Sequence, residues 1–394
     1  MSRLFLIIGI LLLLLTEILR VYFIMPFPGS QQSNSIDWAY LIEKYKWLLR
    51  LIGIALVVMP AYSLYTQKKL WPKIQLSVII AVYFVIFFIF NFRFQADKMF
   101  YQPGYKNFFR VKENKIDSSK LIIGIEINGE ARAYPIQIIG YHHQVRDTVG
   151  NTPVMITYCT VCRTGRVYSP MVNGKPETFR LVGMDHFNAM FEDESTKSWW
   201  QQATGVAIAG PLKGSQLKEI PSHQASLYSW LQKHPNSTIL QPDSNYKEDY
   251  DDLEKFDRGN VKSHLEKRDS ASWKMKSWVV GIKINGLEKA YDWNDLLKEN
   301  FIQDTLGYYP VMLVLEHDTC SFHAFSRLMK GQTLFFLSNK EQALLTDSNT
   351  HSVWNLNGLC TSGLLKDGQL EVLASYQEFW HSWKQFHPYT TQFK

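Results

Sequence analysis

Long apolar stretches dominate the first 95 residues, and each can be measured against the roughly 20 residues that a helix needs to cross a bilayer. The stretch 74–92 has no ionisable residue, and the stretch 47–65 has only Arg50, which is close enough to its start to reach the interface. A third stretch, 4–25, begins with a long run that has no polar side chain. We therefore predict a transmembrane region over 1–95, with spanning helices at about 4–25, 47–65 and 74–92.

The first stretch leaves two interpretations open, because an N-terminal apolar run is either a signal peptide that is cleaved or an anchor that stays. No small-x-small cleavage site follows the run, which favours the uncleaved anchor. If the helix continues to Met25, Glu17 and Arg20 can pair across one helical turn.

The orientation follows from the basic residues between the second and third predicted spans. The segment 67–73 carries three lysines and no acidic residue, so the positive-inside rule places it in the cytoplasm. The third span then leads out of the cytoplasm, whether or not the first stretch is cleaved. We predict a multi-pass protein of the bacterial plasma (inner) membrane, with the lipid bilayer as a partner and the soluble C-terminal region outside the cytoplasm.

The net charge of +6 resembles that of a nucleic-acid-binding protein until it is divided along the chain. Residues 1–110 contain 12 Lys+Arg and 4 Asp+Glu, which leaves 30 and 32 for the remainder. A basic excess confined to the apolar part is typical of residues that flank membrane spans. We therefore exclude nucleic acid as a partner. Four cysteines in 394 residues also exclude a disulfide scaffold.

The soluble region contains an internal repeat. Residues 122–155 align without a gap to 279–312, and 13 of the 34 positions are identical. We predict an α+β fold in which transmembrane helices precede a β-rich soluble region of two tandem repeats. The first repeat is expected at 110–240 and the second at 272–390, joined by a linker or long loop at 241–271.

Turn dipeptides and alternating apolar residues predict the elements of the first repeat. The Asn-Gly pair at 128–129 predicts a hairpin, and the apolar segment 153–158 predicts a short buried strand. A second hairpin is expected around the Asn-Gly pair at 173–174. A helix is expected over 222–233, with Ser222 as its N-terminal cap.

The predicted buried strand leads directly into a Cys-x-x-Cys motif formed by Cys159 and Cys162. This spacing lets two sulfurs close a small disulfide ring or hold one soft metal ion between them. The guanidinium groups of Arg163 and Arg166 are expected to favour thiolate over thiol. The catalytic candidates are therefore Cys159, Cys162, Arg163 and Arg166. A permanent disulfide in an oxidising compartment is the alternative interpretation.

Copper(I) is the metal that we expect first, because two thiolates suffice for linear coordination, and zinc is the other candidate. The proposed metal ligands are Cys159, Cys162 and His142, since a histidine is the usual further ligand and His142 precedes the strand. Its neighbour His143 would point to the opposite face if both lie on a strand. A structural zinc site needs four ligands, and the sequence has no second Cys-x-x-Cys motif.

The second repeat lacks the motif. At the offset of 157 residues it has Glu316 and Thr319 in place of the two cysteines, so we expect one site per chain. Cys320 and Cys360 are either a disulfide or two buried thiols. Tryptophans that recur in both repeats indicate core packing rather than a platform for an aromatic or carbohydrate ligand.

The segments TYCTVCRTG, SWWQQATGVAIAGPLKGSQLKEIPS and SWLQKHPNSTIL resemble a bacterial family known as domain of unknown function 3179. The resemblance covers essentially all of residues 110–390. The usual motif of that family is similar to Thr-Tyr-Cys-Pro-Leu-Cys-Gly-Thr, so the resemblance implies that Cys159 and Cys162 are the two cysteines of the family. Arg163 replaces the usual glycine and cannot adopt a positive φ as cheaply.

The same resemblance places His142 on a histidine that is common in the family, and it places His143 where a glutamate is usual. That replacement argues against a shared ligand role for position 143. The resemblance implies no established activity.

Two hypotheses follow for the function. In the first, a membrane-anchored extracytoplasmic protein uses its Cys-x-x-Cys site for thiol–disulfide exchange or for binding copper or zinc, with a redox or metal-delivery protein as partner. In the second, the chain is a non-enzymatic binding or assembly module with a structural disulfide. Hydrolysis ranks third, because the sequence has neither a Gly-x-Ser-x-Gly nor a His-Glu-x-x-His motif.

Overall fold

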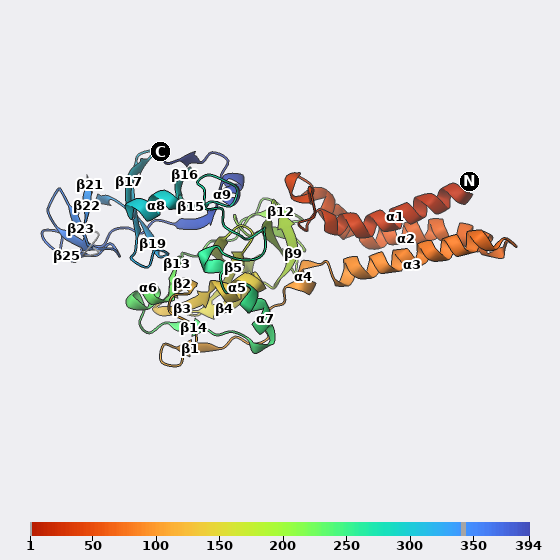
Figure 1. The fold of residues 1–394 in the computed structure, drawn as a ribbon, viewed down its shortest axis with the longest axis horizontal. Helices are drawn as coiled ribbons and strands as arrows, with labels where there is room; N and C mark the ends of the chain where they lie inside the picture. Colours follow the sequence, from red (N-terminus) through yellow and green to blue (C-terminus); the bar gives the residue numbers. More distant parts are fainter. Residues whose placement is uncertain (1, 340–343) are drawn as a thin grey trace. The chain divides into compact units, whose positions relative to one another are not determined.

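The computed structural model describes residues 2–339 and 344–394 (Figure 1). Contacts divide the chain into two compact units. The first unit is Met1–Tyr101 with Glu177–Gln216, and the second is Gln102–Pro176 with Leu217–Lys394. Apolar helices come first and a β-rich region follows, so the predicted fold class is confirmed at this level.

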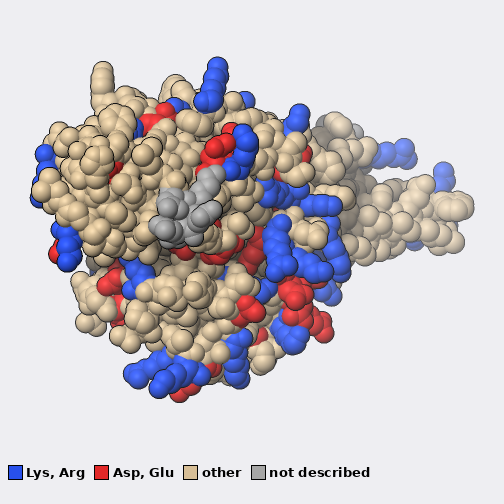
Figure 2. Space-filling model, turned by 60° about the vertical axis from the view of Figure 1, so that its left-hand side comes forward, with Lys and Arg blue, Asp and Glu red and all other residues tan. Residues whose placement is uncertain are grey.

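Three helices of the first unit are long and apolar enough to cross a membrane: α1 (Ser2–Tyr22), α2 (Ile36–Thr66) and α3 (Leu70–Phe92). They pack side by side (Figure 1), and Figure 2 shows few charged side chains over them. The 31 residues of α2 extend about 46 Å, more than the hydrocarbon thickness of about 30 Å. Its polar first turns precede the predicted start near residue 47, so α2 is longer than one membrane crossing requires. The short elements η1 (Ser30–Gln32) and α4 (Ala96–Met99) flank these helices.

A buried ionic network joins the three helices. The fully buried carboxylate of Glu17 accepts hydrogen bonds from Arg50 Nε at 2.7 Å and from Arg50 Nη2 at 2.8 Å. The amide of Asn91 donates to Glu17 at 2.8 Å, and its oxygen accepts from Arg50 at 2.9 Å. Arg20 lies 3.8 Å from Glu17 and pairs more closely with Glu43, at 2.8 Å. The expected contact between Glu17 and Arg20 is therefore longer than the contact of Glu17 with Arg50 and that of Arg20 with Glu43.

An antiparallel sheet in the order β12-β11-β10-β9 completes the first unit. Its strands are β9 (Phe179–Asp185), β10 (Asn188–Asp193), β11 (Trp199–Gln201) and β12 (Ala207–Ala209). The loop after α1 holds this sheet: the N–H of Met184 donates to the oxygen of Ile24 at 2.7 Å, and the N–H of Phe187 donates to Gln31 at 3.0 Å. Only glycine fits at Gly183, because a Cβ there would lie 2.3 Å from the oxygen of Ile24.

The second unit has two halves, and the first half contains a sheet in the order β1-β14-β3-β2-β13 and a sheet in the order β4-β5-β6. The strands of these sheets are β1 (Phe108–Arg110), β2 (Leu121–Ile127), β3 (Glu130–Pro135), β4 (Gln144–Val149), β5 (Thr152–Cys159), β6 (Thr164–Tyr168), β13 (His223–Ser226) and β14 (Thr238–Leu240). The remaining elements of this half are α5 (Ile136–His142), α6 (Leu227–Lys233), β7 (Met171–Val172) and β8 (Lys175–Pro176).

The second half contains sheets in the orders β26-β15-β16-β27, β17-β18-β19 and β22-β23-β24-β25, and the pair β20-β21. Its strands are β15 (Trp278–Ile284), β16 (Leu287–Asp292), β17 (Phe301–Leu306), β18 (Tyr309–Leu315), β19 (Phe322–Ser326), β20 (Leu328–Met329), β21 (Gln332–Thr333), β22 (Phe336–Asn339), β23 (Leu344–Asp347), β24 (Val353–Asn355), β25 (Cys360–Ser362), β26 (Ser375–Phe379) and β27 (Thr391–Gln392). Its helices are α8 (Trp293–Glu299) and α9 (Trp380–Phe386).

The two halves share an order of elements, which supports the predicted repeat. Strands β2 and β3 pair around the Asn-Gly turn at 128–129, and β15 and β16 pair around the Asn-Gly turn at 285–286. A helix follows each hairpin, and a three-stranded sheet follows each helix. The hairpin and the buried strand predicted in the first half are confirmed. The tandem repeat itself stays a prediction.

Several local predictions need correction. The Asn-Gly turn at 173–174 joins only the two-residue strands β7 and β8, because β6 pairs with β5 instead of continuing the hairpin. The predicted helix over 222–233 begins as strand β13, so its cap is Ser226, whose hydroxyl accepts from the N–H of Ser229. The predicted bounds of the repeats stay a prediction; contacts group Glu177–Gln216 with Met1–Tyr101.

The expected linker at 241–271 is a packed segment. It forms η2 (Ser244–Tyr246), α7 (Lys247–Asp252) and η3 (Phe256–Arg258). Tyr250 and Phe256 are buried in the second unit. Burial of these aromatic side chains supplies the free energy that orders this polar segment.

Replacing Glu17 by glutamine should destabilise the helices of the first unit. The change leaves Arg50 buried beside a neutral amide, and removing one partner of a buried ion pair costs about 3–5 kcal/mol. The measurement is thermal unfolding of the full chain in detergent, monitored by the circular dichroism signal of the helices. Lys68→Gln is the matched control, because Lys68 is exposed, and it should unfold as the wild type does. An unchanged midpoint for Glu17→Gln would show that the network does not hold the helices together.

Candidate functional site

The Cys-x-x-Cys segment forms the tight turn between β5 and β6. Cys159 is the last residue of β5 and pairs with Thr164, the first residue of β6. Cys159 and Cys162 are both thiols and both 0% exposed. Arg163 has a φ of 56°, so it adopts the left-handed conformation that a glycine would adopt at lower cost.

The environment of Cys162 favours the protonated thiol. Burial raises the pKa of Cys162 well above its usual value, and hydrogen bonding to Cys159 adds to this effect. Lys276 and Ser382 act in the opposite direction without overcoming burial. A thiol that stays protonated is a weak nucleophile. Burial therefore opposes the thiolate that we expected at Cys162.

Lys276 is the cation that acts on both sulfurs. Its ammonium group donates to the oxygen of Val161, inside the Cys-x-x-Cys segment, at 2.6 Å. His381 Nε2 lies 3.2 Å from Lys276 Nζ and 3.2 Å from the oxygen of Val161. Burial lowers the pKa of Lys276, while Cys162 and Cys159 oppose this. Burial, together with Lys276, lowers the pKa of His381 to about 3, so this imidazole is neutral at pH 7.

The two predicted arginines point their guanidinium groups at other partners. Arg163 Nε donates to Gln377 Oε1 at 2.9 Å, and its guanidinium lies 3.8 Å from the centre of a Trp278 ring. Arg166 forms a buried ion pair with Glu378. Burial acts to lower the pKa of Arg166, but Glu378 raises it above its usual value. Both arginines therefore bind residues of the second half, and Lys276 takes the place that we expected them to occupy.

The turn belongs to a buried joint between the halves of the second unit. The N–H of Phe379 donates to the oxygen of Cys162 at 3.0 Å. The hydroxyls of Thr164 and Ser382 lie 3.1 Å apart, and Ser382 donates to Glu378 at 2.9 Å. We call this set, with Cys159, Arg166 and Lys276, the cysteine joint.

Sequence reasoning missed Lys276 and His381, which lie 115 and 220 residues from Val161 along the chain. No spacing motif connects residues at such separations. One signal was available: α9 matches α6 at an offset of 153 residues, so pairing of the two repeats would place α9 opposite the first half.

His142 is the last residue of α5, and His143 follows it with a φ of 62°. The segment forms a helix, so the strand geometry that would point the two histidines to opposite faces does not apply. His142 Nε2 lies 2.6 Å from the hydroxyl of Tyr250. In residues 2–339 and 344–394, no three His, Cys, Asp or Glu side chains form a group that could hold a metal ion. The structure therefore does not bring His142 to the two cysteines as a third ligand.

The remaining cysteines resolve an alternative that the sequence left open. Cys320 and Cys360 are both thiols, so they do not form the disulfide. Cys360 is buried, whereas Cys320 lines a cavity and is half-buried. Burial raises the pKa of Cys320 to about 12. The core role expected for the recurring tryptophans is confirmed by Trp199 and Trp354, both 0% exposed.

Acidification should destabilise the second unit below about pH 6.5. Burial lowers the pKa of His143 from 6.5 to about 4, and that of His381 falls to about 3. Between these values the unfolded chain binds protons that the folded chain does not, so stability falls as pH falls, by about 1.4 kcal/mol per pH unit for each histidine.

The measurement is denaturant unfolding of the full chain in detergent at pH 7 and pH 5. The double variant His143→Gln/His381→Gln should lose less stability over this interval than the wild type. The control His264→Gln, at an exposed position, should lose as much as the wild type. Equal losses in all three proteins would contradict the assignment.

Comparisons with known proteins agree with the resemblance found in the sequence. No curated protein and no solved structure matches this chain. A family model matches residues 102–390, which include both halves of the second unit and the sheet of the first unit. The chain therefore belongs to the family described as protein of unknown function (DUF3179).

Proposed function

We propose that this protein is a membrane-anchored, extracytoplasmic binding module in which Cys159 and Cys162 have a structural role. The complete burial of both sulfurs is the observation that carries this proposal. Thiol–disulfide exchange requires a thiolate and access for the attacking group. Burial prevents access, and the raised pKa of Cys162 opposes thiolate formation. The cysteine joint is thus better suited to holding two halves together than to reacting with a partner.

The membrane placement is supported by the three apolar helices and by the lysines between two of them. Lys68 and Lys69 lie in the connection from α2 to α3, and Lys73 is in the first turn of α3. By the positive-inside rule this connection faces the cytoplasm. The second unit follows α3 and lies outside the cytoplasm in this orientation, at the bacterial plasma membrane.

A soft-metal or redox site at the same cysteines is the second candidate function. Lys276 favours it, because its positive charge acts on both sulfurs. Two thiolates and one copper(I) ion carry a net negative charge, which a neighbouring ammonium group would offset in a buried site. The same pair could close to a disulfide when an oxidising partner protein accepts its two electrons. Zinc does not fit, because it needs three or four protein ligands and residues 2–339 and 344–394 form no such group.

The native fold should protect Cys159 and Cys162 from alkylation. The variant Cys320→Ser/Cys360→Ser leaves these two thiols as the only reporters in the chain. In detergent, we expect a maleimide to label them at least about 100-fold more slowly in native protein than in guanidinium, because opening a buried core segment costs about 3 kcal/mol or more. Mass spectrometry of timed samples measures the labelling.

Two further measurements separate the candidates. Cys159→Ser/Cys162→Ser should remain folded with a lower unfolding temperature if the joint is structural. Rapid native labelling, a reversible disulfide, or one equivalent of copper that is lost in Cys159→Ser/Cys162→Ser would instead establish the second candidate.

A further inference from the structure

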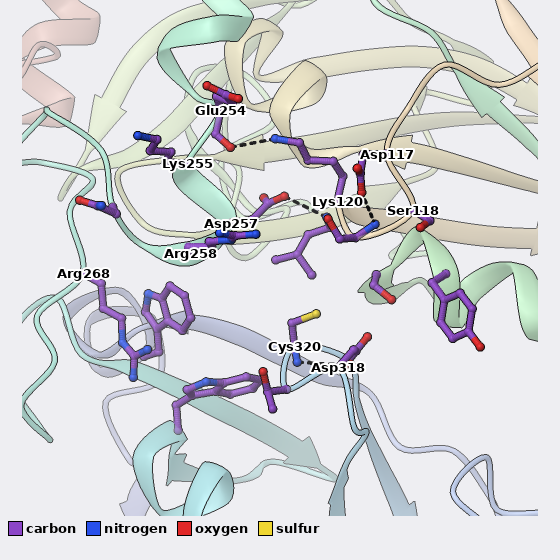
Figure 3. Close-up of a pocket in the computed structure, with 18 of the residues that line it drawn as sticks. Asp117, Ser118, Lys120, Glu254, Lys255, Asp257, Arg258, Arg268, Asp318 and Cys320 are labelled. Carbon is purple, nitrogen blue, oxygen red and sulfur yellow. Dashed lines mark hydrogen bonds between the residues drawn. The ribbon is translucent and has the colours of Figure 1, made fainter.

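A cavity of about 1130 Å³ lies in the second unit. Its walls come from the segment before β2, the segment around η3, the start of β15 and of α8, and the turn after β18. Figure 3 labels its charged residues and Cys320. Its volume is slightly above the roughly 300–1,000 Å³ of typical small-molecule sites.

The charges of this wall balance one another. Four acidic and four basic residues line the cavity: Asp117, Glu254, Asp257, Asp318, Lys120, Lys255, Arg258 and Arg268. A cavity lined by charges of one sign would attract ligands of the opposite charge. A balanced lining favours a ligand that carries both charges over a polyanion such as a nucleotide.

Three buried side-chain atoms of the wall have no hydrogen-bond partner within the described part of the chain: Asp257 Oδ1, Arg268 Nε and Trp278 Nε1. Other atoms hold two of these side chains in place. Asp257 Oδ2 accepts from the N–H of Leu121 at 3.0 Å, and Arg268 Nη2 donates to Asn294 at 2.7 Å. A buried polar atom without a partner costs about 1–3 kcal/mol. The three residues line the cavity, but these atoms have almost no accessible surface, so a ligand satisfies the one acceptor and two donors when the side chains shift toward it.

Trp278 contributes its N–H rather than an open ring face. The guanidinium groups of Arg163 and Arg268 lie 3.8 Å and 4.1 Å from ring centres of Trp278. Trp293 packs edge-on against it, with ring centres 6.1 Å apart, and is itself 1% exposed. These contacts leave little aromatic surface for stacking a sugar or a base. Recognition in this cavity therefore relies on charge and hydrogen bonds.

We propose that the cavity binds a short zwitterionic peptide. Its ammonium group would donate to Asp257 Oδ1, and its carboxylate would accept from Arg268 Nε and Trp278 Nε1. The volume accommodates more than one amino acid, which is why a peptide fits better than a single residue. This inference deepens the proposed binding function and rests on it for the location outside the cytoplasm.

Isothermal titration calorimetry on the full chain in detergent tests the ligand class, with trialanine as the probe. We expect trialanine to bind at least tenfold more tightly than N-acetyl-trialanine amide, which lacks both charges, and than citrate, which lacks the ammonium group. Three results would overturn the proposal. They are no binding of trialanine at about 10 mM, equally tight binding of the capped peptide, and tighter binding of citrate.

Variants of the wall locate the site. Asp257→Asn keeps the side-chain shape and can still accept from Leu121, and Arg268→Gln removes the charge and the Nε donor. Both should weaken trialanine binding at least tenfold. Asp252→Asn and Arg110→Gln, at exposed positions outside the cavity, should change it less than twofold. Trp278→Phe removes the N–H donor together with part of the buried ring, and it should weaken trialanine binding at least tenfold if an arginine or aspartate variant fails to fold.

Failure of this proposal can be separated from failure of the proposed function. Slow native labelling of the cysteines without trialanine binding would overturn the peptide site and leave the structural role of the joint. Rapid labelling with tight trialanine binding would overturn the structural role and support the peptide site.

Discussion

The buried ion pair of Arg166 and Glu378 is the interaction on which the second unit depends. These residues are 2% and 1% exposed, and removing two charges from water costs several kcal/mol for each ion. The attraction repays this cost only when the remaining polar atoms are also bonded. Here Arg166 donates to the oxygen of Gly165 at 2.8 Å, and Ser382 donates to Glu378 at 2.9 Å. Any shift of β26 relative to β6 would leave unpaired buried charges, so this pair fixes the packing that places Cys162 beside Ser382.

The first unit obeys the same constraint. Glu17 and Arg50 lie on helices long and apolar enough to cross a membrane, and a bilayer would offer no water to solvate them. Asn91 completes the network by donating to one residue and accepting from the other. Because the network joins α1, α2 and α3, helix packing that separated the charges would carry a large cost. Apolar side chains can pack in many arrangements. In both units, a few buried charges favour the one arrangement in which every charge is paired.

The features that could be predicted from the sequence are those that depend on neighbouring residues. The Asn-Gly turn at 128–129 and the apolar helices follow from local preferences, and the structure contains both. The helix at 136–142 was missed because its short apolar run, between strands, has no period that separates helix from strand. Ser222 was chosen as a cap on local grounds, but pairing of β13 with β2 extends the strand to Ser226. Lys276 could not be predicted, because only the assembled sheets bring it to the cysteines.

The restriction of the cysteines to one half also has a physical reason. At the predicted repeat offset, Glu316 takes the place of Cys159, and it accepts from Ser229 of α6 at 2.7 Å and contacts His323. Ser229 corresponds to Ser382 at an offset of 153 residues. The helix of each half thus brings a serine to the other half: Ser229 contacts Glu316, and Ser382 contacts Cys162. Glu316 has 19% of its side chain exposed, whereas Cys159 has none. A carboxylate needs that water or a counter-charge, but a thiol does not, so cysteine suits the joint that is completely dry.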